Sequence, residues 1–94
     1  MTRVLAKFES HYRAALPSLR NELERGDPAV LQQLAHSVRG AASTIGARGV
    51  AELAGRLETT LAGQRPADEA KHAGQALLDA LAALVDALAA AARA

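Results

Sequence analysis

The middle of the chain holds a histidine whose neighbours suit it for chemistry on a negatively charged group. Arg39, Gly40 and Ser43 follow His36 at distances of three, four and seven residues. In a helix of about 3.6 residues per turn, these spacings place them all on one face. An unprotonated imidazole nitrogen is a nucleophile, and the planar guanidinium of arginine matches phosphate oxygens. The pattern indicates a histidine that can accept a phosphoryl group beside a cation that meets its charge.

The apolar residues around His36 indicate that it points outward. They form a stripe whose mean direction lies about 170° around the helix axis from His36: Leu31, Leu34, Val38 and Ile45. An ordinary surface histidine would occupy the same position. Gly40 favours a functional histidine over an ordinary surface one. A glycine inside a helix costs about 1 kcal/mol of stability relative to alanine, and a need for open space beside the imidazole would explain why a glycine is present. Gln32, Gln33 and Ser43 extend an uncharged surface that a partner could contact.

A second helix should bring a carboxylate to the imidazole. The short link at residues 46–48 predicts an antiparallel helical hairpin, and counting outward from it places Glu58 level with His36. A carboxylate that accepts from one ring nitrogen fixes the tautomer and leaves the other nitrogen as the nucleophile. Without that contact, Glu58 would be an exposed helix charge. The hairpin also predicts a low shoulder of small, partner-facing residues beside the histidine: Ala51, Ala54 and Gly55.

Four stretches have the apolar periodicity of amphipathic helices. Their apolar stripes span residues 5–23, 31–45, 50–61 and 70–88. Pro17 predicts either a kink in the first helix or the start of a new helix near Leu16, because proline lacks a backbone donor and crowds the preceding turn. The breaks between the stretches contain glycine or proline: Gly26, Gly46, Gly63 and residues 64–66.

The start of the second helix carries two local signals. Asp27 is of the type that caps a helix N-terminus, and Pro28 suits the first turn. Alanine is abundant and β-branched residues are sparse, so no strand is expected. Four amphipathic segments with short links pack most simply as an up-down-up-down four-helix bundle, which makes residues 1–94 one all-α domain. The alternative is a helical hairpin that completes its core by oligomerising.

The composition excludes several classes of protein. The 94 residues include no cysteine, the net charge is +1 and there is no run of Lys or Arg, so thiol catalysis is excluded and nucleic acid is not an expected partner. Asp79 and Asp86 interrupt the apolar C-terminal stretch, which favours a soluble amphipathic helix over membrane insertion. The N-terminus lacks the continuous apolar stretch of a signal peptide. We expect a cytoplasmic protein.

The residues around His36 resemble the signature of histidine-containing phosphotransfer (Hpt) domains. That signature has a histidine, a basic residue three positions on, glycines four and ten positions on with small residues between them, and a later Leu-Glu pair. Residues 34–46 match it, and Leu57 and Glu58 supply the pair. The family very commonly has lysine at the position of Arg39, and some members have glutamine at that of Glu58. With residues 19–27 also similar, the resemblance covers almost the whole chain.

The resemblance implies a four-helix bundle that carries a phosphoryl group between aspartates of receiver domains, which belong to response regulators or hybrid histidine kinases. His36 would be the phosphoacceptor, Arg39 would meet the phosphate charge and Glu58 would orient the imidazole. The family has no kinase site of its own. No cofactor is therefore expected on this chain, and the Mg²⁺ for transfer is expected on the receiver. We expect the domain to act as a monomer.

Three other functions are compatible with parts of this pattern. The bundle could be an interaction-only module, in which His36 is incidental. It could also be the phosphoacceptor domain of a chemotaxis-type histidine kinase, loaded directly by an ATP-binding domain. A metal enzyme would have to use His11, His36 and His72, whose spacings give no paired-ligand motif.

Overall fold

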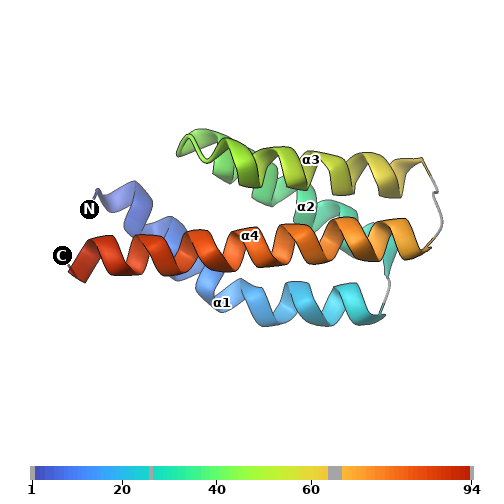
Figure 1. Cartoon of the computed structure of the whole chain (residues 1–94), viewed down its shortest axis with the longest axis horizontal. Helices are drawn as coiled ribbons and strands as arrows, with labels where there is room; N and C mark the ends of the chain where they lie inside the picture. Colours follow the sequence, from blue (N-terminus) through green and yellow to red (C-terminus); the bar gives the residue numbers. More distant parts are fainter. Residues whose placement is uncertain (1, 26, 64–66, 94) are drawn as a thin grey trace.

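The computed structural model describes residues 2–25, 27–63 and 67–93, in which all regular structure is helical. The helices are α1 (Arg3–Arg25), α2 (Pro28–Thr44), α3 (Arg48–Ala62) and α4 (Ala67–Arg93). Successive helices run in opposite directions, α2 packs against α3 and α1, and α4 packs against α1 and α3 (Figure 1). The expected all-α, up-down-up-down bundle is confirmed. The breaks predicted at Gly26 and at residues 64–66 lie outside the described residues.

Local signals in the sequence set both ends of α2. The Asp27 carboxylate accepts from the backbone N–H groups of Ala29 and Val30 at 3.1 and 3.4 Å, as expected of an N-cap. At the other end, Gly46 adopts a φ of +78°, a left-handed conformation that glycine reaches without steric cost. The chain reverses direction at this turn and continues into α3, so the predicted antiparallel hairpin of the helices that carry His36 and Glu58 is confirmed.

Helix α1 is continuous from Arg3 to Arg25 with Pro17 inside it. Figure 1 shows the helix changing direction part-way along. The expected kink is therefore present, and the alternative of a new helix near Leu16 is wrong. The reason is packing, because side chains on both sides of the proline, including Tyr12 and Leu19, are buried in the same core.

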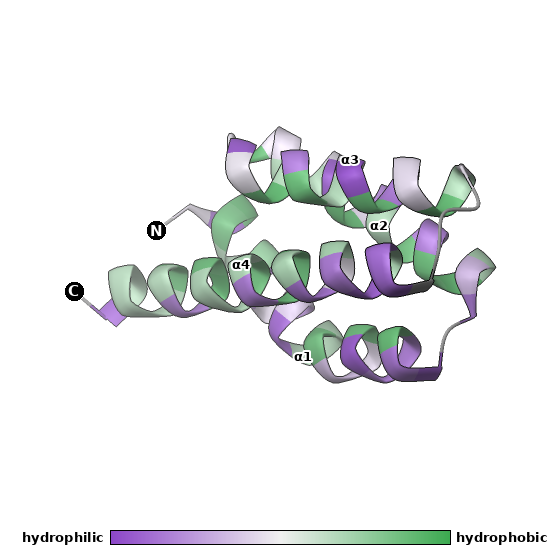
Figure 2. Ribbon diagram, turned by 45° about the vertical axis from the view of Figure 1, so that its right-hand side comes forward, coloured by the Kyte–Doolittle hydropathy of each residue, from purple (hydrophilic) through white to green (hydrophobic). Residues whose placement is uncertain are grey.

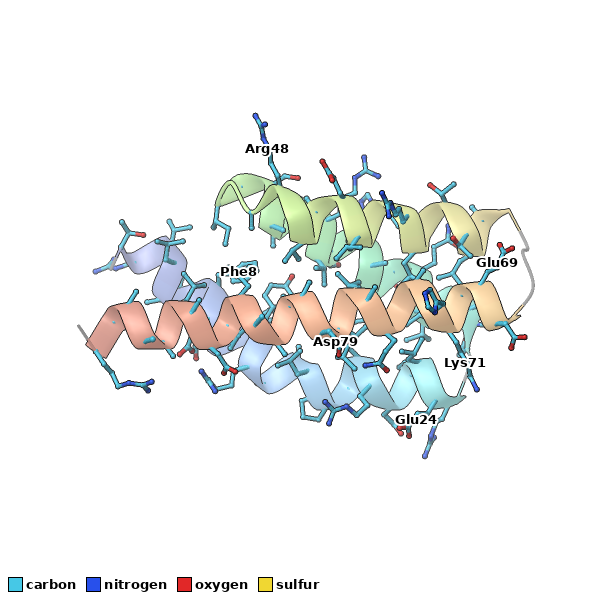
Figure 3. The ribbon with its side chains drawn as sticks, viewed as in Figure 1. Phe8, Glu24, Arg48, Glu69, Lys71 and Asp79 are labelled. Carbon is cyan, nitrogen blue, oxygen red and sulfur yellow. The ribbon has the colours of Figure 1, made fainter. Side chains whose placement is uncertain are left out.

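The core lies along the apolar faces of all four helices, and Figure 2 shows how hydrophobic and hydrophilic residues alternate along each of them. Leu57, Leu77 and Val85 are completely buried. Between α2 and α3 the buried residues include alanines, namely Ala35, Ala42 and Ala54, each 0% exposed. Short side chains let these two helix backbones approach closely. Charged side chains such as Glu24 and Arg48 point away from the bundle (Figure 3).

Length and composition alone would allow residues Asp68–Arg93 of α4 to cross a membrane. In the bundle, this helix supplies Leu77, Leu78 and Leu81 to the core and packs against α1 and α3. Asp79 and Asp86 are exposed. Part of the apolar surface of α4, 28% of the apolar window, is thus buried in the bundle, and the exposed Asp79 and Asp86 give the helix an amphipathic character.

Candidate functional site

His36 lies on α2 with its side chain 76% exposed. It occupies the face opposite the buried residues Leu31 and Val38, as the helical periodicity predicts. An imidazole this accessible can be reached by a large partner without any movement of the bundle. The prediction that His36 points outward is confirmed.

The carboxylate of Glu58 on α3 contacts the imidazole. Its Oε2 lies 3.1 Å from Nδ1 of His36, and the Glu58 side chain is only 16% exposed. An ionised carboxylate can only accept hydrogen bonds, so this contact assigns the hydrogen of a neutral ring to Nδ1. Nε2 then keeps its lone pair. The counting argument that placed Glu58 level with His36 is confirmed.

Glu58 also binds the neighbouring cation. Its Oε1 accepts a hydrogen bond from Nη1 of Arg39 at 3.3 Å, while the Arg39 side chain stays 55% exposed. One carboxylate therefore joins imidazole and guanidinium, one oxygen to each. Sequence reasoning placed Arg39 on the face of His36 and missed this ion pair, because the pair depends on how closely α2 and α3 approach.

On α2, the surface around the imidazole is open, and apart from Arg39 its residues carry no Lys, Arg, Asp or Glu side chain. Gln32, Gln33, Gly40 and Ser43 are all exposed on α2. A Cβ atom built at Gly40 would meet none of the described residues within 4 Å, apart from the helix's own nearby backbone. The space that the glycine leaves is therefore solvent, as expected if Gly40 clears an approach to His36.

The predicted shoulder on α3 is only partly at the surface. Ala51 and Gly55 are half-buried and border the open face. Ala54 is 0% exposed and belongs to the core, so the prediction that it faces a partner is wrong. The side chain of alanine is compatible with either environment, and position 54 lies in the core rather than at the surface.

The sequence model of the family described as Hpt domain matches residues 3–91. The chain belongs to the Hpt domain family. Members of this family are phosphotransfer carriers in His-Asp phosphorelays, are not kinases, and interact with receiver domains of response regulators. Searches of curated proteins and of solved structures give no match.

In this Hpt domain, a tyrosine of α1 forms a hydrogen bond to the helix that carries His36. The Tyr12 hydroxyl donates to the main-chain carbonyl oxygen of Ser37, the residue after His36, over 3.3 Å. The Tyr12 ring stacks at an angle on Phe8 and meets His11 edge-on, each with centroids 4.7 Å apart. Burial raises the pKa of the Tyr12 hydroxyl above 10.0, so it stays a donor at neutral pH. The apolar spacing identified Tyr12 as a core residue but gave no sign of this bond.

The three histidines are not part of a common metal site. His11 is an exposed residue of α1 beside Tyr12, and His72 is exposed on α4. Within the described ranges, no group of three or more His, Asp or Glu side chains could hold a metal ion. A hollow of about 1030 Å³ is lined by residues of α3 and α4, including Gly55 and His72, and by Arg39 of α2.

Proposed function

We propose that this Hpt domain is a phosphorelay intermediate. It accepts a phosphoryl group on Nε2 of His36 from the aspartyl phosphate of one receiver domain and passes it to the aspartate of another. The observation that carries the proposal is the contact between Glu58 and Nδ1 of His36 on an otherwise exposed ring. It supplies a nucleophilic nitrogen that already has the required tautomer and faces the open surface.

The proposed phosphoryl transfer to His36 needs no additional acid or base on this chain. The Nε2 lone pair forms the N–P bond while the P–O bond to the donor aspartate breaks, and the bonding electrons return to that carboxylate. No proton has to leave Nε2, because the ring proton is already on Nδ1. The positive charge that develops on the imidazole lies beside the Glu58 carboxylate. Transfer onward is the same step in reverse, toward the next aspartate.

Arg39 supports the proposal from the phosphate side. Its guanidinium is exposed and shares a carboxylate with His36, so a short rotation of the side chain would bring it to the phosphoryl oxygens. Neutralising those oxygens is the main electrostatic requirement of phosphoryl transfer. The receiver's Mg²⁺ would supply the remaining positive charge, and this chain would supply the nucleophile and the arginine.

The partner surface that we propose is the open face around His36. It comprises the exposed Gln32, Gln33, Gly40 and Ser43 of α2 together with the half-buried Ala51 and Gly55 of α3. These side chains are short or uncharged. A receiver that places its own charged phosphorylation site over the imidazole would therefore meet no like charge from these residues.

Phosphoryl loading tests the proposal directly. Receiver domains from the source genome would be phosphorylated with acetyl phosphate and Mg²⁺ and mixed with the unchanged protein or with His36→Ala. We expect acid-labile, alkali-stable phosphate on the unchanged protein and none on the variant. If no receiver loads the chain, or if His36→Ala is loaded equally, the relay function is excluded and an interaction-only module is favoured.

The same assay separates the relay from a chemotaxis-type phosphoacceptor. The protein would be incubated with the ATP-binding domains of histidine kinases from the same genome, ATP and no receiver. On the relay proposal, His36 stays unphosphorylated until a phosphorylated receiver is added. Loading by a kinase domain alone, at a rate that exceeds loading by any receiver, would contradict the proposal.

A further inference from the structure

Gly55 lies in the middle of α3 directly beneath the side chain of Arg39. A Cβ atom built at Gly55 would lie 3.6 Å from Cδ of Arg39, although the two residues belong to different helices. Gly55 is half-buried. The aliphatic stem of Arg39 thus passes over a position of α3 that has no side chain.

This crossing carries the guanidinium to Glu58, three residues further along α3. The stem passes Gly55 at Cδ, and the next atoms lead to Nη1, which donates to Glu58. A contact of 3.6 Å is an ordinary van der Waals distance, so a single methyl group would fit. Non-hydrogen atoms beyond Cβ would enter the volume that the Arg39 stem occupies. A β-branched residue has two such atoms at the γ position, in or next to that volume.

The bond at the end of the stem is easily exchanged. The Arg39–Glu58 distance is 3.3 Å, whereas strong hydrogen bonds between charged groups are about 2.7–2.9 Å. The guanidinium is also more than half exposed, at 55% for the side chain. Arg39 is therefore held loosely at Glu58, and a phosphoryl group on the adjacent imidazole would offer it a stronger bidentate partner.

We propose that Gly55 is a positioning residue for phosphoryl transfer: its missing side chain leaves a track across α3 that lets Arg39 bind Glu58 and then turn to the phosphoryl group on His36. The inference rests on the relay function proposed above. Gly55 would affect phosphoryl transfer through the position of Arg39, and only glycine or alanine at position 55 would leave room for the arginine stem.

Three variants of α3 test the track in the isolated protein. The valine side chain of Gly55→Val should block the Arg39 stem, whereas the methyl group of Gly55→Ala should not. Gly49→Val is the position control: it adds valine to the same helix at a site where a Cβ meets none of the described residues within 4 Å, apart from the nearby helix backbone. Nitrogen-15 NMR of the Arg39 guanidinium reports its contact with Glu58. We expect that signal to change in Gly55→Val as it changes in Glu58→Ala, and to stay in place in the other two variants. An unchanged signal in Gly55→Val would overturn the proposal, whether or not any receiver loads His36.

A double-mutant cycle with Arg39→Ala then identifies the route of the effect. Gly55→Val should slow loading of His36 by the same factor as Arg39→Ala, about tenfold for a lost charge-assisted contact. In the Arg39→Ala background it should cause no further loss. A second, additive loss would show that the valine obstructs receiver docking or the hollow between α3 and α4, and would contradict the proposal. Gly55→Leu replaces Gly55→Val if circular dichroism shows the valine variant to be unfolded.

Discussion

At the level of single residues, the site depends on how one carboxylate is shared. Glu58 is 16% exposed and gives one oxygen to His36 and the other to Arg39. The imidazole is thereby oriented without being covered. On the relay proposed above, the guanidinium would also lie close enough to meet the negative charge of a phosphoryl group on Nε2.

Replacing Glu58 separates orientation from charge. Glu58→Gln keeps an oxygen that can accept from Nδ1 but removes the negative charge, whereas Glu58→Ala removes both. We expect Glu58→Ala to slow loading of His36 about tenfold or more, because a hydrogen bond to a charged group contributes roughly 1.5–3 kcal/mol, and Glu58→Gln to slow it less. Nitrogen-15 NMR of the neutral ring should show mixed tautomers in Glu58→Ala alone. Equal loading of both variants and the unchanged protein would exclude a role for this carboxylate.

Gly40 tests whether the space beside the imidazole is functional. Gly40→Leu places a bulky side chain on the exposed face one turn from His36, so transfer from a phosphorylated receiver should slow by about tenfold or more while the helix becomes no less stable. Phosphoramidate, a small phosphodonor, provides the control, because it should still load His36 in this variant. Normal transfer from the receiver would show that Gly40 does not define the approach path.

At the level of the helices, the most reliable predictions came from residues whose effect is local. Asp27 and Pro28 predicted the start of α2 because a cap acts on backbone groups two or three residues away. Pro17 could not be decided in the same way. Whether a proline kinks or ends a helix depends on what both halves pack against, and here Tyr12 and Leu19 are buried in one core.

The glycines of α2 and α4 should respond in opposite ways to the same substitution. Gly40 borders open solvent, but a Cβ at Gly74 would overlap the Leu23 side chain, which is itself buried between α1 and α4. Gly40→Ala should raise the free energy of unfolding by about 0.5–1 kcal/mol through helix propensity. Gly74→Ala should lower it by about 1–2 kcal/mol, because the overlap costs more than the propensity gains.

Urea unfolding monitored by circular dichroism measures both free energies. Gly49→Ala serves as a second reference, since its Cβ also avoids the described residues. If Gly74→Ala proves as stable as Gly40→Ala, the Leu23 side chain has room to move, and the close contact between α1 and α4 does not depend on the glycine.

At the level of the whole molecule, the sequence predicted the bundle and the face that carries His36, but not the details between helices. Periodicity defines a buried face within one helix, so it identified the apolar stripes. It could not decide that Ala54 is buried, because alanine fits core and surface alike. The Arg39–Glu58 pair and the passage over Gly55 depend on the distance between α2 and α3, which no single-helix pattern contains.

Tyr12 links the tertiary packing to the pH dependence of stability. Burial raises the pKa of its hydroxyl above the usual 10.0, because the tyrosinate would be poorly solvated in the core. As the pH rises past about 10, the unfolded chain therefore loses this proton while the folded chain keeps it. The contribution of Tyr12 is constant below that range, and stability falls as the pH rises toward the folded pKa.

Comparison with Tyr12→Phe separates the effect of Tyr12 ionisation on stability from the effects of lysines and other groups that titrate at high pH. At pH 7 the variant should lose less than about 1 kcal/mol, because it keeps the aromatic packing and gives up only the long hydroxyl contact to Ser37. Above pH 10, the unchanged protein should lose stability more steeply than Tyr12→Phe, so the difference between them shrinks or reverses. Urea unfolding at a series of pH values between 7 and 11 measures that difference. A constant difference across the series would mean that Tyr12 ionises as readily in the folded bundle as in the unfolded chain, and that its hydroxyl is not shielded beneath α2.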